Sequence, residues 1–314
     1  MSESDWKEIP LSKTTKFIVD NRGKTAPTET CGIPLIATNC INNRDLYPKY
    51  ENLRYVSKGT YENWFRSHPK PSDIILTLKG SQNGAVCLVP NPVNFVIAQD
   101  MVALRANEDI IDPLFLFAAL RSPFIQQQIE NLDVSGVIPH FKKSDFDKLL
   151  IPYPDKDMQK IIGKIYYDFC KKIDLLHRQN KTLEAMAETL FKQWFVVEAK
   201  EDWEFVELGK YVNCINGISY KSSELNPSKK AMVTLKNFDR NGGFRLDGFK
   251  EYTGKYKKQH VVVQGDLVVA HTDITQEADV IGNPVLVVSG CNYDEMIISM
   301  DLVKVISKYD WLSN

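Results

Sequence analysis

The chain has 314 residues, of which 43% are apolar and 25% charged, a composition typical of a globular protein with room for two domains. No apolar run approaches the roughly 20 residues that cross a bilayer, so a membrane-spanning helix is not expected. The formal net charge of −1 is unusual for a simple nucleic-acid binder, although it does not exclude a local basic patch.

The first half of the chain alternates short strand-like runs with turn residues. Strands are expected at "DIILTL", "AVCLVP" and "MVALRA", separated by the turns "KGSQNG" and "PNPVN". A helix is predicted over "DPLFLFAALRSPFIQQQIENL", with Asp112 as N-cap and Pro113 as its first residue. A short helix is expected at Ser144–Asp147, before a strand that ends at the Pro152/Pro154 pair. This pattern predicts an α+β domain.

From Asp155 to about Val197 the apolar residues follow a heptad pattern. Two series of positions, each with a period of seven, make up the pattern: Ile162, Phe169, Leu176, Leu183 and Leu190, and then Tyr166, Ile173, Asn180, Ala187 and Trp194. These repeats are typical of a coiled-coil seam, in which Asn180 would fix the register. About 40 helical residues form a rod of roughly 60 Å. We therefore predict a spacer helix that packs on a partner helix; the alternative is a long helix packed on its own domain.

The second half repeats the first. "DWKEIPLSK" returns as "DWEFVELGK", and "PLIATNCINN" is echoed by "AMVTLKNFDRNGG". "KPSDIILTLKG" returns as "VQGDLVVAHTD", with Asp73 over Asp266. "QDMVALRA" returns as "SMDLVKVI", with Asp100 over Asp301. Because the four matches keep their order and nearly their spacing, we predict a duplicated domain.

The residue patterns of common catalytic sites are missing. The chain has no G-x-x-x-x-G-K-[ST] phosphate loop, no G-x-G-x-x-G fingerprint and no Asn-Pro-Pro-aromatic motif of adenine methyltransferases. Its histidines have no second ligand at metal spacing. Six singly scattered cysteines, and a polar start unlike a signal peptide, indicate reduced thiols in a cytoplasmic protein. We expect no catalysis and no metal site.

The order of these parts resembles the specificity (S) subunit of type I restriction–modification systems. The resemblance rests on "WKEIPLSK", "DIILTLKGSQNG", "GVIPHFKKSDFDKLLIPYP" with its continuation "DKDMQKIIGKI", and "LEAMAETLFKQWF". The family's junction between recognition domain and helix is matched by Ile151, Pro152, Pro154, Gln159 and Ile162. The resemblance implies tandem target-recognition domains, each a mixed sheet with short helices, separated by a long coiled-coil spacer helix. The expected ranges are 1–154, 155–198 and 199–314.

The resemblance also implies a function. An S subunit binds double-stranded DNA at a bipartite site, and each recognition domain reads one half of it. Its spacer helices dock modification (methyltransferase) subunits, and restriction subunits join them. S-adenosylmethionine, ATP and Mg are expected in those partner subunits, with no cofactor in this chain. Two alternatives remain open: a coiled-coil adaptor, and an incomplete specificity protein that binds modification subunits without reading a full site.

DNA contacts are expected on polar loops, because base edges and phosphates pair with amides, hydroxyls and cations. In the first copy the candidates are Arg22, Lys24, Thr38, Asn39, Asn42, Arg44, Lys79, Ser81, Gln82, Asn83, His140, Lys142 and Lys143. In the second copy they are Asn237, Arg240 and His271. These loops could equally be simple turns rich in Asn and Gly.

The second copy stops early relative to the first. No equivalent of the first copy's helix, final strand or spacer follows the "MDLVKVISKYDWLSN" segment, so the second domain is expected to be incomplete. The seam would then need a substitute partner. The expectation is self-association through the spacer helix, or helices of a modification subunit.

Overall fold

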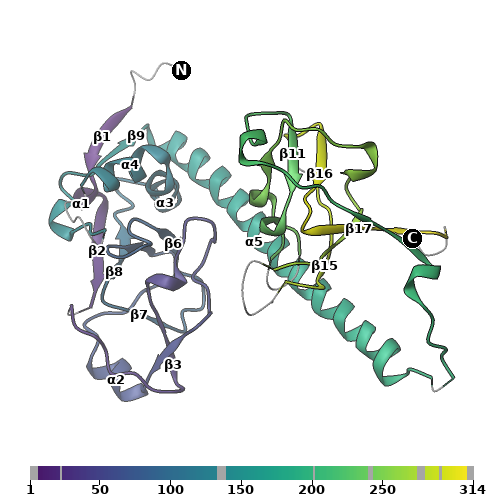
Figure 1. Ribbon diagram of the computed structural model, residues 1–314. Helices are drawn as coiled ribbons and strands as arrows, with labels where there is room; N and C mark the ends of the chain where they lie inside the picture. The colour runs from purple at the N-terminus through teal and green to yellow at the C-terminus, as the bar shows by residue number, and fades with distance from the viewer. Residues whose placement is uncertain are drawn as a thin grey trace. The chain divides into compact units, whose positions relative to one another are not determined.

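The computed structural model describes residues 6–21, 23–132, 139–200, 202–239, 243–273, 280–289 and 292–309. The chain divides into two compact units, Met1–Glu198 and Ala199–Asn314, and the first carries one long helix (Figure 1). Short helices and mixed sheets in both units confirm the predicted α+β class. Among the described residues, no helix combines the length and the apolar character needed to cross a membrane.

The first unit contains two sheets and a separate strand pair. An antiparallel sheet has the order β2 (Thr15–Asp20), β8 (Met101–Ala106), β5 (Ile74–Thr77) and β6 (Val86–Leu88). A mixed sheet has the order β4 (Arg54–Val56), β3 (Ile33–Ile36) and β7 (Val96–Ile97), in which β3 and β7 are parallel. The pair is β1 (Lys7–Pro10) with β9 (Leu150–Tyr153). All of β5 is buried, as its continuous apolar run predicts.

The single helix predicted after Asp112 is in fact two helices. The helices α3 (Pro113–Arg121) and α4 (Pro123–Asn131) meet at Ser122, whose backbone is extended. The chain breaks here because Pro123 disfavours helical backbone at the residue before it. The N-cap prediction is confirmed, since Asp112 Oδ1 accepts a hydrogen bond from the Phe115 N–H at 2.9 Å.

The other helical segments of the first unit are short. They are α1 (Leu11–Thr14), α2 (Lys58–Asn63), and the 3-10 helices η2 (Thr38–Cys40) and η3 (Lys143–Asp145). The segment η3 replaces the short helix predicted at Ser144–Asp147. Its bonds span three residues, since the N–H of Phe146 bonds to the carbonyl of Lys143 at 3.2 Å.

The predicted long helix is confirmed as α5 (Lys156–Lys192), which continues as one π-helical segment, η4 (Gln193–Val197). Asp155 caps it by accepting hydrogen bonds from two backbone N–H groups at 3.0 Å. The start of α5 packs on α3 at Gly163, where an added Cβ would lie 2.4 Å from Phe115 N. Buried Gln159 holds the junction, because its Oε1 accepts from the Asp112 N–H at 2.9 Å.

The second unit repeats the strand order of the first unit's antiparallel sheet and has one more strand in its mixed sheet. Its antiparallel sheet has the order β10 (Val212–Asn216), β17 (Leu302–Ser307), β14 (Leu267–Ala270) and β15 (Pro284–Leu286). Its mixed sheet has the order β12 (Lys250–Glu251), β11 (Lys230–Val233), β16 (Glu295–Ile298) and β13 (Val261–Val262), with β11 and β16 parallel. Its 3-10 helices are η5 (Leu208–Lys210), η6 (Ser222–Glu224), η7 (Leu235–Asn237), η8 (Leu246–Gly248) and η9 (Lys258–His260).

The two copies share individual contacts as well as topology. Asp73 Oδ2 accepts from the backbone N–H of Lys70 at 2.8 Å, and the same carboxylate pairs with Arg105 at 2.8 Å. In the second unit Asp266 accepts from the N–H three residues earlier at 2.8 Å and pairs with Lys304 at 2.6 Å. The aspartates aligned from the sequence therefore perform the same task, which supports the duplication.

The contact between α5 and α3 reverses the usual effect of a Gly→Ala change. Alanine normally stabilises a helix relative to glycine by up to about 1 kcal/mol. We predict that Gly163→Ala instead destabilises the first unit by about 1–3 kcal/mol, since the new methyl group meets backbone atoms. Urea unfolding followed by circular dichroism measures the change. The matched control is Gly59→Ala in α2, where the nearest atom to a new Cβ is Ser57 Oγ at 3.8 Å. Equal effects of the two variants would contradict the assigned packing.

Candidate nucleic-acid interface

The strand register brings several loops of the first unit to one end of its antiparallel sheet. Asp20, the last residue of β2, lies opposite Val102, and Thr77, the last residue of β5, lies opposite Met101. Neighbouring strands run in opposite directions, so the chain leaves β2 and β5 where it enters β8 and β6. The loops after β2 and β5 therefore share one end with the loop before β8.

Two backbone hydrogen bonds bring further segments to the same end. The Ala98 N–H bonds to the carbonyl of Ile36 at 2.8 Å, so the turn after β3 lies beside the entry to β8. The Phe141 N–H bonds to the carbonyl of Leu78 at 2.9 Å. We call this end of the sheet the loop face, and it is formed by residues 23–26, 38–45, 78–85, 98–100 and 139–143.

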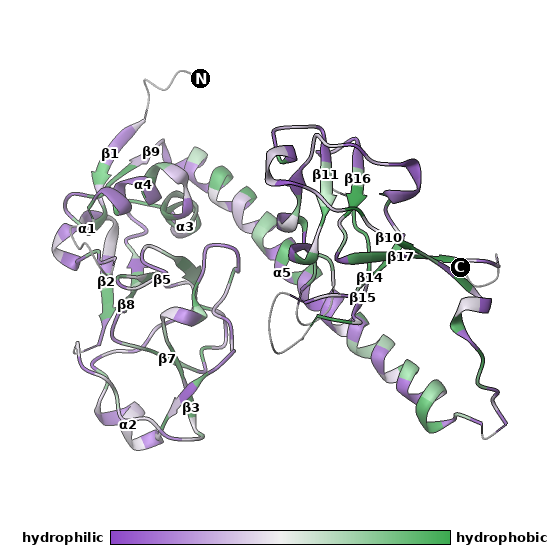
Figure 2. Cartoon of the chain, in the orientation of Figure 1, coloured by the Kyte–Doolittle hydropathy of each residue, from purple (hydrophilic) through white to green (hydrophobic). Residues whose placement is uncertain are grey.

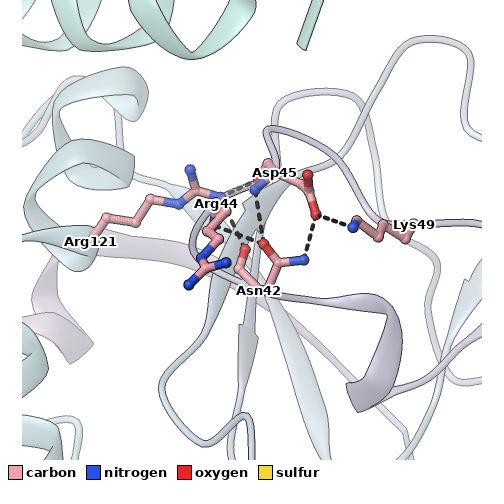
Figure 3. Close-up of polar contacts among 5 residues, drawn as sticks. All are labelled: Asn42, Arg44, Asp45, Lys49 and Arg121. Atoms are coloured by element: carbon pink, nitrogen blue, oxygen red, sulfur yellow. Dashed lines mark hydrogen bonds and ion pairs between the residues drawn. The ribbon is translucent and has the colours of Figure 1, made fainter. Parts of the chain in front are cut away.

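The loop 42–45 is held by its own side chains (Figure 3). Asn42 Oδ1 accepts hydrogen bonds from the backbone N–H groups of Arg44 at 2.8 Å and Asp45 at 2.9 Å. The Asn42 amide nitrogen donates to the Asp45 carboxylate, which also pairs with Lys49 at 3.4 Å. The half-buried Asn42 therefore shapes the loop, and its predicted contact with DNA stays a prediction. The side chain of Arg44 is exposed and makes no ion pair among the described residues.

Arg121, at the end of α3, fixes this loop from within the domain. The residue is only 9% exposed, and its guanidinium donates to the carbonyls of Asn42, Asp45 and Val86. The group also lies 4.4 Å from the ring centroid of Phe117. A buried cation is costly unless its donors are satisfied, and here backbone carbonyls and an aromatic face serve that purpose. The loop backbone is thus coupled to β6 and α3.

Asn43 connects loop 42–45 to the next loop. Its Oδ1 accepts from the Val86 N–H at 2.8 Å, and its amide nitrogen donates to Gln126 Oε1 at 3.2 Å. Gln126 in turn donates to the carbonyl of Gly84 at 2.9 Å. Both loops are therefore positioned by one network that runs through α4.

The loop 79–84 has a fixed backbone and exposed side chains. The Thr77 hydroxyl donates to the carbonyl of Ala85 at 3.2 Å, and the Asn83 N–H bonds to the Gly80 carbonyl at 2.9 Å. Gly80 and Gly84 have φ of 92° and 80°, a conformation that favours glycine. The side chains presented to solvent are Lys79, Ser81 and Gln82. Asn83 Oδ1 is buried without a hydrogen-bond partner.

The segment 139–143 adds further cationic residues to the loop face. His140 lies beside Lys79 through an antiparallel bridge. Lys143 forms an ion pair with Asp20, which anchors the segment to the end of β2. The side chain of Lys142 is exposed. Lys79 and Lys142 therefore remain available for phosphate, whereas Lys143 is already paired within the protein.

A cavity of about 100 Å³ opens on the loop face. The predicted residues Lys24 and Thr38 line it, and Asn39 is exposed next to Thr38. Sequence reasoning missed the other polar and aromatic residues of its wall, which include Arg54, Trp64 and Gln99. Gln99 Oε1 is buried and has no hydrogen-bond partner. The parallel pairing of β3 with β7 places Gln99, and the antiparallel pairing of β3 with β4 places Arg54. No local motif indicates these positions.

The second unit gives a mixed result for its candidates. Asn237 is 0% exposed, its Oδ1 accepts from the Thr234 N–H at 2.9 Å, and its amide donates to the Arg245 carbonyl at 2.8 Å. Its burial contradicts a role in contacting DNA, because the amide is used to close a turn. The ring of exposed His271 contacts the Met300 carbonyl at 2.6 Å. Arg240, like Arg22 of the first unit, lies outside the described residues.

The heptad seam on α5 divides into two parts. Ile162 and Tyr166 pack against the core of their own unit, and the ring of Tyr166 lies 5.7 Å from that of Phe117. Burial raises the pKa of Tyr166 accordingly. For these two positions the alternative of a helix packed on its own domain is therefore correct. The seam side chains from Phe169 onward are exposed, and we call them the stripe: Phe169, Ile173, Leu176, Asn180, Leu183, Ala187, Leu190 and Trp194. Figure 2 shows hydrophobic and hydrophilic residues alternating along α5.

A metal-binding cluster is not found among the described residues, where no three His, Cys, Asp or Glu side chains gather as a metal ion would require.

Replacing the buried guanidinium tests the support of the loop face. We predict that Arg121→Met lowers the free energy of unfolding of the first unit by about 2–4 kcal/mol, because buried carbonyls lose their donors. Arg121→Lys should recover only part of this loss, since one ammonium cannot replace the forked donors. The matched control is Arg44→Met in the same loop, expected to change stability by less than about 0.5 kcal/mol. Urea titration measures all three, and an unaltered midpoint in Arg121→Met would refute the assigned role.

Comparison with known proteins identifies the family. Residues 4–185 match the family model described as the type I restriction modification DNA specificity domain. The specificity subunit of the type I restriction enzyme MjaVIII from Methanocaldococcus jannaschii is 30% identical, over 85% of this chain and 63% of that protein. The specificity subunit of the HindI enzyme from Haemophilus influenzae is 28% identical, over 62% of this chain and 41% of that protein. The chain thus spans less than two thirds of either relative.

A solved structure shares the fold. The S subunit of a type I restriction-modification system from M. genitalium aligns with 97% of this chain and 73% of its own, with 16% identity and a TM-score of 0.54. At that identity the similarity concerns the fold alone. The family match covers more than half of the sequence, and on that basis the chain belongs to the family of type I restriction modification DNA specificity domains.

Proposed function

We propose that this chain is a non-catalytic, sequence-specific DNA-binding subunit that directs a type I restriction–modification complex to a bipartite target site. The observation that carries the proposal is the convergence of five segments at the loop face, where exposed cations and amides lie on loops with fixed backbones. The antiparallel sheet of the second unit has the same strand order as that of the first, which suits a protein that reads two half-sites.

The chemistry of the loop face fits the two tasks of DNA recognition. Phosphates require exposed cations, and Lys24, Arg44, Lys79 and Lys142 are exposed without an ion pair among the described residues. Base edges require amides and hydroxyls held in place, and Ser81 and Gln82 lie on a loop fixed by Thr77. A net charge of −1 is compatible with this, because the cations are concentrated locally.

A second role, docking of protein partners, is favoured by the exposed part of α5. Phe169 is 67% exposed and Leu183 is 61% exposed, although heptad positions normally insert into a facing helix. We propose that helices of modification subunits, or α5 of a second copy, cover this stripe. Restriction subunits would join the same assembly. S-adenosylmethionine, ATP and Mg would be bound by those partner subunits.

Removing cations from the loop face should weaken DNA binding at every sequence alike. For the double variant Arg44→Ala/Lys79→Ala, we expect the slope of log affinity against log salt to fall by about 1 for each phosphate that the variant no longer binds. The matched control is Lys16→Ala, an exposed lysine near the start of β2, at the opposite end of the sheet. Fluorescence anisotropy with a randomised duplex at several salt concentrations measures the slopes. A control slope reduced as much as that of the double variant would place DNA binding elsewhere.

Charging the stripe on α5 should abolish partner binding without unfolding the domain. We predict that Phe169→Glu/Leu183→Glu loses self-association or binding to a purified modification subunit, because carboxylates cannot be buried in an apolar seam. Lys171→Glu, on the same helix but outside the seam, should behave as wild type. Light scattering after size exclusion reports both. A double variant that still assembles would show that the stripe is not the interface.

A further inference from the structure

The cavity on the loop face has walls suited to a base rather than to a phosphate group. Trp64, Phe65 and Leu35 supply apolar surface, while Lys24 and Arg54 supply cations and Asp100 supplies a carboxylate. The carboxylate disfavours an anion inside the cavity, whereas the two cations suit a phosphate outside it. A planar, uncharged group with polar edges fits such mixed walls.

Gln99 lines the cavity and has an unpaired hydrogen-bond acceptor. It lies in the three-residue connection between β7 and β8, and its Oε1 is buried without a partner. A buried acceptor left unpaired is unfavourable, and such atoms are uncommon in native proteins. A ligand that offers both an N–H donor and an acceptor would pair with the whole amide.

The second unit has a different residue at the equivalent position. The N–H of Leu78 bonds to the Asp100 carbonyl at 2.9 Å, and that of His271 bonds to the Asp301 carbonyl at 3.1 Å. On the other side of the connection, Ala98 bonds to β3 as Ser299 bonds to β11. These contacts place Met300, which is 51% exposed, at the position of Gln99. The same scaffold therefore accepts an amide or an apolar side chain here.

We infer that Gln99 is a specificity-determining residue that reads one adenine in the half-site bound by the first unit. Adenine offers the donor N6 and the acceptor N7 on its major-groove edge, which pair with Oε1 and Nε2 of a glutamine. Cytosine offers only a donor there, and guanine only acceptors. Lys24 and Arg54, exposed cations at the same cavity, would bind the adjacent phosphates. This inference rests on the proposed function, because it assumes that the loop face binds DNA.

The test compares the base preferences of wild type, Gln99→Met and Gln99→Glu, each as the full chain with its modification subunit. Duplexes recovered from a randomised pool are sequenced. Wild type should enrich a motif with one adenine that depends on residue 99. The second unit already has a methionine at the equivalent position, so the Gln99→Met variant should fold. It should also keep the base preferences of wild type at every other position of the motif. Its preference for that adenine should fall by about 5- to 150-fold. Gln99→Glu, which can only accept hydrogen bonds, should shift the same position toward cytosine.

Three outcomes would contradict the inference. A folded Gln99→Met that selects an unchanged motif would overturn it, as would an unchanged motif with Gln99→Glu if the methionine variant fails to fold. Loss of all binding by folded variants would also overturn it, because the residue would then support the loop face as a whole. A wild-type pool that enriches no motif would instead contradict the proposed function itself.

Discussion

The buried guanidinium of Arg121 is the interaction on which the loop face depends. It couples the end of α3 to the carbonyls of loop 42–45 and to β6, and α3 is itself packed on the start of α5 through Gly163. The acceptors of the guanidinium are backbone carbonyls, and it lies against the ring of Phe117. The loops that carry exposed side chains are therefore rigidly connected to the helix proposed to carry the partners.

The duplication shows which contacts the fold requires and which it leaves variable. Asp73 just before β5 and Asp266 just before β14 each pair with a cation of the neighbouring strand. That cation is Arg105 in the first unit and Lys304 in the second. The connection between the two sheets keeps its backbone hydrogen bonds while Gln99 becomes Met300. A fold with a constant frame and variable loop residues suits a protein whose two units read different sequences.

Strong local signals predicted the fold well, whereas the site was predicted only as a set of regions. The long helix at the heptads, the Asp112 cap and the repeated strand patterns were confirmed, whereas the partner helix of the seam stays a prediction. The break at Ser122 was missed because the helical pattern continues past Pro123. In loops, an Asn or Gln side chain can either close a turn or contact a base, and the sequence does not distinguish the two roles. Asn237 was therefore predicted to contact DNA, although its side chain closes a turn. Gln99 carries no local signal, since its role depends on the parallel pairing of β3 with β7.

Hydrogen–deuterium exchange of the full chain, with and without a selected duplex, is the sharpest test of the loop face as the DNA-binding surface. We predict slower exchange on DNA binding in segments 38–45, 78–85 and 98–100, with no change at the β1–β9 pair at the other end of the first unit. Protection confined to β1, β9 or the exposed face of α5, with the loop face unaltered, would contradict that assignment.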